Sequence, residues 1–135
     1  MAHTPFLNVI PQRHTTDCAV ACLAMLLGVD YEASLLAFGK YSLVIVRDIK
    51  RAAKRLGYTL HWTRKFELET DTGILGVRST KWDYEHLVVL KDGLIVDTDA
   101  TVWDADVFLA AYEATPQSLL VVKEGKSDGR PTSTK

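Results

Sequence analysis

The sequence lacks several features that whole classes of protein require. No apolar run approaches the roughly 20 residues needed to span a bilayer, so no membrane partner is expected. The formal net charge is −1, and no overall electrostatic field attracts nucleic acid or a membrane surface. The first residues contain neither the basic region nor the apolar stretch of a signal peptide. These absences favour a soluble globular protein over a secreted, membrane or nucleic-acid-binding one.

Cysteine is also scarce, and both cysteines, Cys18 and Cys22, lie in one short segment. They are four residues apart, and two positions on one helical face at this spacing rarely reach disulfide geometry. We therefore expect two free thiols in a reducing compartment, with the cytoplasm as the default. The chain has no further cysteine and histidine pairs at zinc-ligand spacing, so neither a metal nor another cofactor is expected.

The size and composition indicate one domain. A chain of 135 residues can bury about two-thirds of the surface that it exposes when unfolded, enough for a hydrophobic core. The composition is 47% hydrophobic and 24% charged, as in ordinary globular proteins. We assign residues 1–122 to this domain. Residues 123–135 are polar and rich in Gly, Ser, Thr and Lys, which is typical of a disordered tail.

Hydrophobic periodicity predicts helices in the first half of the chain and strands mainly in the second half. The segment "CAVACLAMLL" (18–27) has no polar face, which is typical of a central helix surrounded by protein. Helices followed by a mostly antiparallel sheet indicate an α+β fold. The expected helices are 18–27, 31–38, 47–57 and 104–113; the expected strands are 58–64, 73–77, two within 86–97, and 118–122.

Cys18 is a candidate nucleophile because it lies at the start of the first predicted helix. Cysteine attacks as the thiolate, and the free N–H groups and positive dipole end at a helix start favour an anion. Cys22 lies one turn further in, where we expect it to fill the core. Cysteine is often buried as a small, inert hydrophobic residue, so its position alone leaves a purely structural role open.

A candidate base and a group to orient it lie in the predicted hairpin. His86 opens its first strand, and Asp97 closes its second strand after the Asp92-Gly93 turn. We expect residue 88 to face 96 and residue 87 to face 97, so that Asp97 lies close to His86. Asp99 competes for the same orienting role, and "DTDA" (97–100) also suits a simple turn.

These segments together resemble a known family. "QRHTTDCAVACLAMLLG" (12–28) and "HLVVLKDGLIVD" (86–97) are similar to the C39 bacteriocin-processing cysteine peptidases and their relatives in the papain-like clan. The spacing from glutamine to cysteine matches the family, as does the order cysteine, histidine, aspartate. The resemblance covers roughly residues 8–122. It implies a papain-like fold, in which N-terminal helices with a buried central helix pack on the C-terminal sheet.

The resemblance also implies a function and a site. It indicates a cysteine peptidase, or a closely related acyl transferase, that acts on a peptide or protein. Asp17, Trp82 and Tyr84 adjoin the motifs and are expected to line the substrate cleft. The implied catalytic roles are Gln12 as oxyanion-hole donor, Cys18 as nucleophile, His86 as base and Asp97 as the group that orients the base.

Two positions depart from the family pattern. Ala19 follows the cysteine where the family usually has glycine, and Thr98 follows the aspartate where it usually has proline. Neither departure removes a catalytic atom, but both leave room for a different substrate. The alternative is a C39-like domain that is catalytically silent and binds a peptide or a partner protein. Such a domain would tolerate Cys18→Ala, whereas an enzyme would not.

A cluster of basic residues offers a third, weaker hypothesis. Residues 40–65 contain half of the lysines and arginines of the chain, against Asp48 as the only acid. On the helix 47–57 these residues form one stripe, which would suit a nucleic acid. Because the net charge is near zero, we expect a solvated helix face instead and no nucleic-acid partner. Trp62, Trp82 and Trp103 could line a cleft, although ordinary packing is the simpler interpretation.

Overall fold

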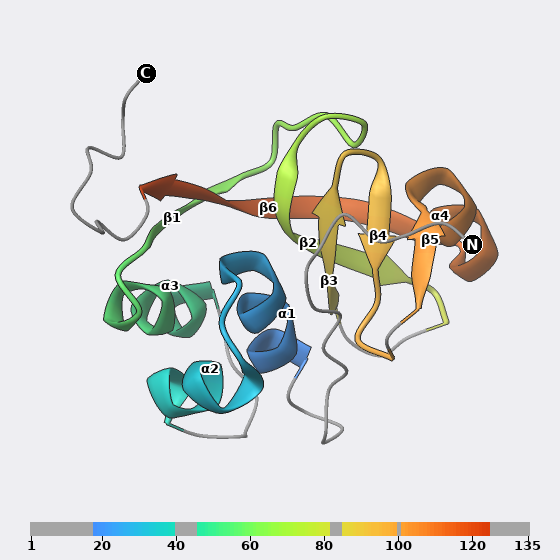
Figure 1. The fold of residues 1–135 in the computed structure, drawn as a ribbon. Coiled ribbons are helices and arrows are strands. Elements are labelled where there is room, and N and C mark those ends of the chain that lie inside the picture. The colour runs from blue at the N-terminus through green and yellow to red at the C-terminus, as the bar shows by residue number, and fades with distance from the viewer. Residues whose placement is uncertain (1–17, 40–45, 82–84, 100, 125–135) are drawn as a thin grey trace.

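Four helices and six strands make up the described part of the chain, which is residues 18–39, 46–81, 85–99 and 101–124 of a computed structural model. Three helices form one layer, and the strands form a single sheet beside it (Figure 1). The expected α+β fold is therefore confirmed. Gln12, Asp17, Trp82 and Tyr84 lie outside the described residues, as do residues 125–135 of the expected tail.

Helix α1 (Cys18–Leu27) is the centre of the helical layer. Eight of its ten residues are buried, as its lack of a polar face predicts. It packs against β2 and β3 of the sheet and against helices α2 (Tyr31–Phe38) and α3 (Val46–Arg55). The buried Ser34 hydroxyl of α2 donates a hydrogen bond to the Val20 carbonyl of α1 over 2.8 Å. Helix α1 is thus held on several sides by the rest of the fold.

The sheet is antiparallel throughout, with strand order β1-β6-β2-β3-β4-β5. Helices α1–α3 cover one face of the sheet, and helix α4 (Ala105–Tyr112) packs against strands β4, β5 and β6. The strands are β1 (Thr59–Thr63), β2 (Thr72–Ser79), β3 (His86–Lys91), β4 (Leu94–Val96), β5 (Val102–Asp104) and β6 (Ala114–Glu124).

Two separate hydrophobic cores result from the alternation of side chains along the strands. Val89 and Val96 join the core that contains α1, whereas Leu90 and Ile95 join the core around Phe108 of α4. Neighbouring residues of one strand point to opposite faces, so the central strands β2, β3, β4 and β6 contribute to both cores. This explains why the central strands are nearly continuous apolar runs.

Two strands differ from the sequence prediction. Strand β5 was not predicted, because its three residues "VWD" are exposed or half-buried and show no clear alternation. Strand β6 is longer than the predicted 118–122 and extends to residue 124, so residues 123 and 124 belong to the sheet and not to the tail. Its Pro116 lies opposite Val77, at the β-bulge between Gly76 and Val77. Proline is tolerated there because a bulge interrupts the hydrogen-bond ladder.

The register of the β3–β4 hairpin also differs from the prediction. Leu90 pairs with Ile95 and Val89 with Val96, so the expected facing of 88 with 96 and 87 with 97 is wrong by one residue. Asp92 and Gly93 have φ values of +48° and +84°, as a two-residue type I′ turn requires. Such a turn pairs the residues directly beside it. The pairing ends at Val89 and Val96, and Asp97 directly follows this last pair.

Gly73 permits the close approach of strands β2 and β6. A Cβ atom at Gly73 would collide with the Leu120 backbone carbonyl, whereas a Cβ at Gly76 would mainly meet the movable end of the Glu85 side chain. We expect Gly73→Ala to lower the free energy of unfolding by about 2–3 kcal/mol, in the upper range for overpacking. Urea denaturation measures this loss. The matched control Gly76→Ala should cost less than about 1 kcal/mol, and equal losses would contradict the prediction.

Candidate active site

Cys18, His86 and Asp97 come from three elements that meet at one end of the sheet (Figure 1). Cys18 is the first residue of α1, His86 is the first residue of β3, and Asp97 directly follows β4. The packing of α1 against β3 brings the helix to this strand. His86 contacts Asp97 through its ring, and the nearby Cys18 thiol contributes to the raised pKa of His86. The structure therefore brings together three of the residues that the sequence singled out.

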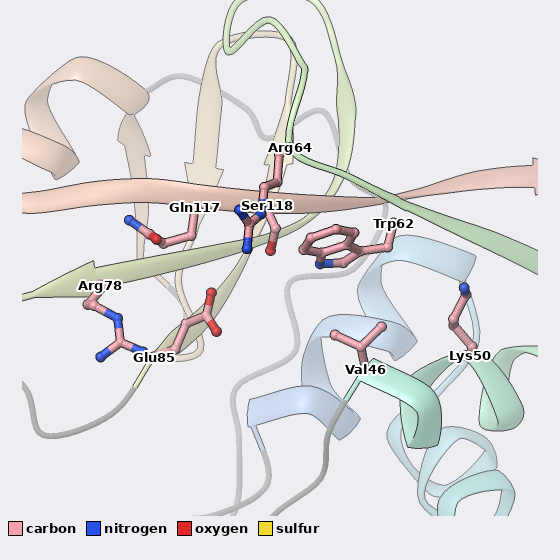
Figure 2. A pocket seen from close by; sticks show the side chains of 8 residues that line it. All are labelled: Val46, Lys50, Trp62, Arg64, Arg78, Glu85, Gln117 and Ser118. Atoms are coloured by element: carbon pink, nitrogen blue, oxygen red, sulfur yellow. The ribbon is translucent and has the colours of Figure 1, made fainter.

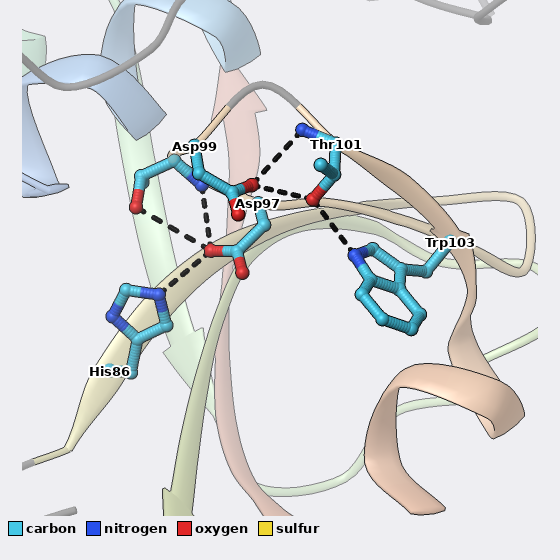
Figure 3. Close-up of polar contacts among 6 residues, drawn as sticks. His86, Asp97, Asp99, Thr101 and Trp103 are labelled. Carbon is cyan, nitrogen blue, oxygen red and sulfur yellow. Dashed lines mark hydrogen bonds and ion pairs between the residues drawn. The ribbon is translucent and has the colours of Figure 1, made fainter. Parts of the chain in front are cut away.

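The contact between His86 and Asp97 is short and shielded from water. His86 Nε2 lies 2.8 Å from Asp97 Oδ1 (Figure 3). The two side chains are only 14% and 10% exposed. Hydrogen bonds between charged groups are strengthened where water is excluded. Nε2 is therefore the ring nitrogen that contacts the carboxylate.

The surroundings of His86 favour its protonated form. Burial lowers the pKa of His86, but the hydrogen bonds to Asp97 and Cys18 and the negative charges of these groups outweigh this effect. The net result raises the pKa of His86 from 6.5 to about 9. The ring is consequently an imidazolium at neutral pH, placed between a carboxylate and a sulfur atom.

Asp97 is held in its ionised form by its neighbours. Burial raises the pKa of Asp97, but the hydrogen bond and charge of His86 and the hydrogen bonds from Thr98 lower it overall. The Thr98 backbone N–H donates to Asp97 Oδ1 over 2.7 Å. The proline that the C39 pattern usually has here could not make this bond, because proline has no N–H. Thr98 thus supplies the carboxylate with an additional donor.

Asp99 has a different role from Asp97. Asp99 Oδ1 accepts hydrogen bonds from the Thr101 backbone N–H at 3.1 Å and from the Thr101 hydroxyl at 2.5 Å (Figure 3). Trp103 Nε1 donates to the same hydroxyl over 2.8 Å, and its ring packs edge-on against Phe108. Asp99 therefore shapes the turn after β4, whereas Asp97 contacts the histidine. In the segment "DTDA", the first aspartate contacts the histidine and the second forms the turn.

The two cysteines differ in accessibility. Both are free thiols, and Cys18 is partly exposed at the helix start. Cys22 is fully buried and fills the core, as expected. Burial, together with the charges of Cys18 and Asp97, raises the pKa of Cys22 well above its ordinary value of 9.0. Of these two thiols, only Cys18 is placed to react with a molecule from solution.

The structure also contains a pocket of about 470 Å³ that the sequence did not predict (Figure 2). One of its lining residues directly precedes His86 in the chain. Glu85 lines it, together with Trp62 and the basic residues Lys50, Arg64 and Arg78. Lys50 and Arg64 belong to the basic cluster already visible in the sequence. Glu85 directly precedes His86 and could be expected at the rim of the site, whereas Arg78 gave no signal, because only the pairing of distant strands brings it to this place.

The comparisons with known proteins bear on the fold. No protein-family model matches the chain, and no curated protein matches it. The structure is similar to the peptidase domain of Streptococcus ComA, described as a bifunctional ABC transporter involved in a quorum-sensing pathway. The TM-score is 0.60 at 16% sequence identity, and the match covers 87% of this chain and 97% of that one. The chain has the papain-like fold of such a peptidase domain, as expected.

Two further observations concern membranes and metals. Within the described ranges, no helix has both the length and the apolar character needed to cross a membrane. Over the same residues, no group of three or more histidine, cysteine, aspartate or glutamate side chains is arranged to hold a metal ion. The groups that meet at the site are a thiol, an imidazole and a carboxylate.

We expect Asp97→Asn to lower the pKa of His86 from about 9 to 6.5 or below, because the amide keeps the shape of the carboxylate without its charge. Burial lowers the pKa of His86, and in this variant the charge of Asp97 would no longer counteract that effect. NMR titration of the imidazole resonances measures this change. Asp99→Asn is the matched control and should leave the pKa of His86 near its original value. An equal fall in the Asp99 variant would mean that Asp99 also acts on the ring.

The stability of the protein should depend on pH through His86. Because folding raises the pKa of His86, protonation of this residue stabilises the folded state. This stabilisation is fully present below the unfolded pKa of 6.5 and is lost as the pH rises through the folded pKa of about 9. We expect the free energy of unfolding to fall over this range by on the order of 2–3 kcal/mol, measured by urea denaturation. His86→Gln should remove most of the decrease, and His61→Gln on β1 should retain it. An unchanged decrease without His86 would contradict the assignment.

Proposed function

We propose that the protein is a cysteine peptidase, or a closely related acyl transferase, that uses Cys18, His86 and Asp97. One observation supports this most directly: His86 contacts Asp97 over 2.8 Å, Cys18 is near enough to raise the pKa of the ring, and Cys18 lies at the start of a helix. Thiol-dependent acyl transfer requires a nucleophile, a base within hydrogen-bond reach and a group that orients the base. The likeness to a peptidase domain is consistent with this proposal.

The first half of the reaction forms a thioester. In the proposed resting state His86 already holds the proton of the Cys18 thiol, and the thiolate is stabilised by the imidazolium and by the N–H groups at the start of α1. The thiolate attacks the carbonyl carbon of a peptide bond, and the carbonyl electron pair moves to the oxygen. The Cys18 backbone N–H donates to this oxyanion. Gln12, by its resemblance to the family, is the second proposed donor.

The second half regenerates the enzyme. The tetrahedral intermediate breaks its C–N bond, and His86 gives its proton to the departing amine. Water then attacks the thioester with His86 as base, which releases a carboxylic acid and restores the thiol. If an amine attacks instead, the acyl group is transferred. Asp97 orients the ring and stabilises its positive charge throughout, without taking the proton itself.

The structure offers less support for nucleic-acid binding by the basic stripe on α3. Arg51 lies 3.9 Å from Asp48, and Arg55 donates a hydrogen bond to the Ala37 carbonyl over 2.6 Å. Two cations of the stripe therefore already have partners within the protein. This favours a structural role for that part of the helix face.

The proposed function predicts an unusually reactive Cys18. We expect iodoacetamide to alkylate Cys18 rapidly at pH 6, where an ordinary thiol with a pKa of about 8.5 is almost entirely protonated. His86→Ala should slow this reaction at least about tenfold, because it removes the base. Mass spectrometry measures the rate at each cysteine separately, and the buried Cys22 serves as an unreactive internal control.

A fluorogenic peptide library then tests turnover. Cys18→Ala should abolish cleavage, whereas Cys22→Ala, at a core position one turn further along α1, should retain it. If Cys18 is unreactive at pH 6, or if its reaction does not depend on His86, the proposal fails. The alternative, a catalytically silent domain that binds a peptide or a partner protein, then becomes the better description.

A further inference from the structure

We infer that the pocket next to His86 binds an acidic side chain of the substrate, so that the site prefers peptides with Asp or Glu near the bond that is cleaved. This inference rests on the proposed function and adds the class of substrate to it. The pocket has a volume of about 470 Å³ and is lined from two sides. Val46 and Lys50 of α3 form one side, and residues of the sheet and the adjoining chain form the other (Figure 2).

The pocket adjoins the catalytic pair. Glu85 lines the pocket and directly precedes His86 in the chain. Its carboxylate lies over Gly76 of β2, at the place that a Cβ of that residue would occupy. The pocket and the Cys18–His86 pair both lie between the helical layer and the sheet. Cys18 belongs to α1 and His86 to β3, and the pocket is lined by α3 and by residues of the sheet. Because Glu85 and His86 are adjacent in the chain, we expect a peptide bound with its carbonyl at Cys18 to extend a neighbouring side chain toward the pocket.

The charge of the pocket is predominantly positive. Lys50, Arg64 and Arg78 line it, whereas Glu85 is the one acidic residue among the described residues that line it. None of these three cations forms a salt bridge with another residue of the described part of the chain. In contrast, Arg51 and Arg55 of the same basic cluster have internal partners. The cations of the pocket are therefore available to an anion from outside.

The arrangement of Arg64 suits a carboxylate. Its guanidinium lies over the Trp62 ring, 5.3 Å from the ring centroid. This contact orients the planar group, and an oriented guanidinium can donate two parallel hydrogen bonds to a carboxylate. Ser118 adds a hydroxyl to the lining, and Trp62 adds an apolar surface for the methylene groups of the ligand. A short acidic side chain matches these features.

The experiment compares substrates that differ only in charge. Internally quenched peptides are prepared in Glu and Gln pairs, with the change placed at each position around the cleaved bond in turn. We expect the Glu peptide to be preferred at one position by at least about tenfold in kcat/KM. The double variant Arg64→Gln/Arg78→Gln should reduce this preference to less than about twofold. Arg47→Gln, an exposed change on α3 outside the pocket, should retain it.

A second readout separates this inference from the proposed function. The alkylation of Cys18 by neutral iodoacetamide reports on the catalytic pair and does not need the pocket. If Cys18 is reactive and peptides are cleaved, but no Glu preference exists or the double variant retains it, the pocket assignment is overturned and the proposed function stands. If Cys18 is unreactive at pH 6 and no peptide is cleaved, the proposed function itself has failed.

Direct binding tests the pocket even in the absence of turnover. The same Glu and Gln peptides are titrated into Cys18→Ala, with tryptophan fluorescence as the signal and Trp62→Phe to assign that signal to the pocket. We expect Glu peptides to bind more tightly than Gln peptides, with an advantage that decreases as salt is added. Equal binding of the two, or tighter binding of a single-stranded oligonucleotide, would overturn the inference.

Discussion

The hydrogen bond between His86 and Asp97 is the contact on which the rest of the site depends. Both groups are largely buried, and a buried charge without a partner is strongly destabilising. His86 begins β3 and Asp97 directly follows β4, so the hairpin closed by the two-residue turn at Asp92-Gly93 brings the pair to one end of the sheet. Thr98 adds a backbone donor to the carboxylate, and Asp99 shapes the following turn. The hairpin thus presents a protonated, oriented imidazole before any substrate binds.

Helix α1 supplies the third group from the opposite layer. Its buried residues pack between the sheet and the other helices, so the sulfur of Cys18 is attached to one of the most constrained elements of the fold. A catalytic group on such an element is placed more accurately than one on a loop. The packing of α1 therefore both stabilises the core and positions Cys18.

The interface between helices and sheet has a second consequence, which concerns the substrate. The same two layers that bring Cys18 to His86 also line the pocket, whose residues come mainly from α3 and from strands β1, β2 and β6. Its cations belong to residues that are far apart in the sequence, and one of them is held against Trp62. Reaction and substrate preference would then depend on one structural boundary, with the thiol and imidazole at one part of it and the arginines at another.

The sequence by itself determined the elements whose signals are local. The apolar run 18–27 predicted α1, Asp92-Gly93 predicted the hairpin, and the short separation of His86 from Asp97 predicted their contact. Tertiary structure decided what depends on distant partners: the hairpin register, the choice of Asp97 over Asp99, strand β5, and the pocket around Arg64 and Arg78. The physical reason is that periodicity and turn residues act over a few positions. Packing and strand pairing, in contrast, join segments whose order along the chain says little about their distance in space.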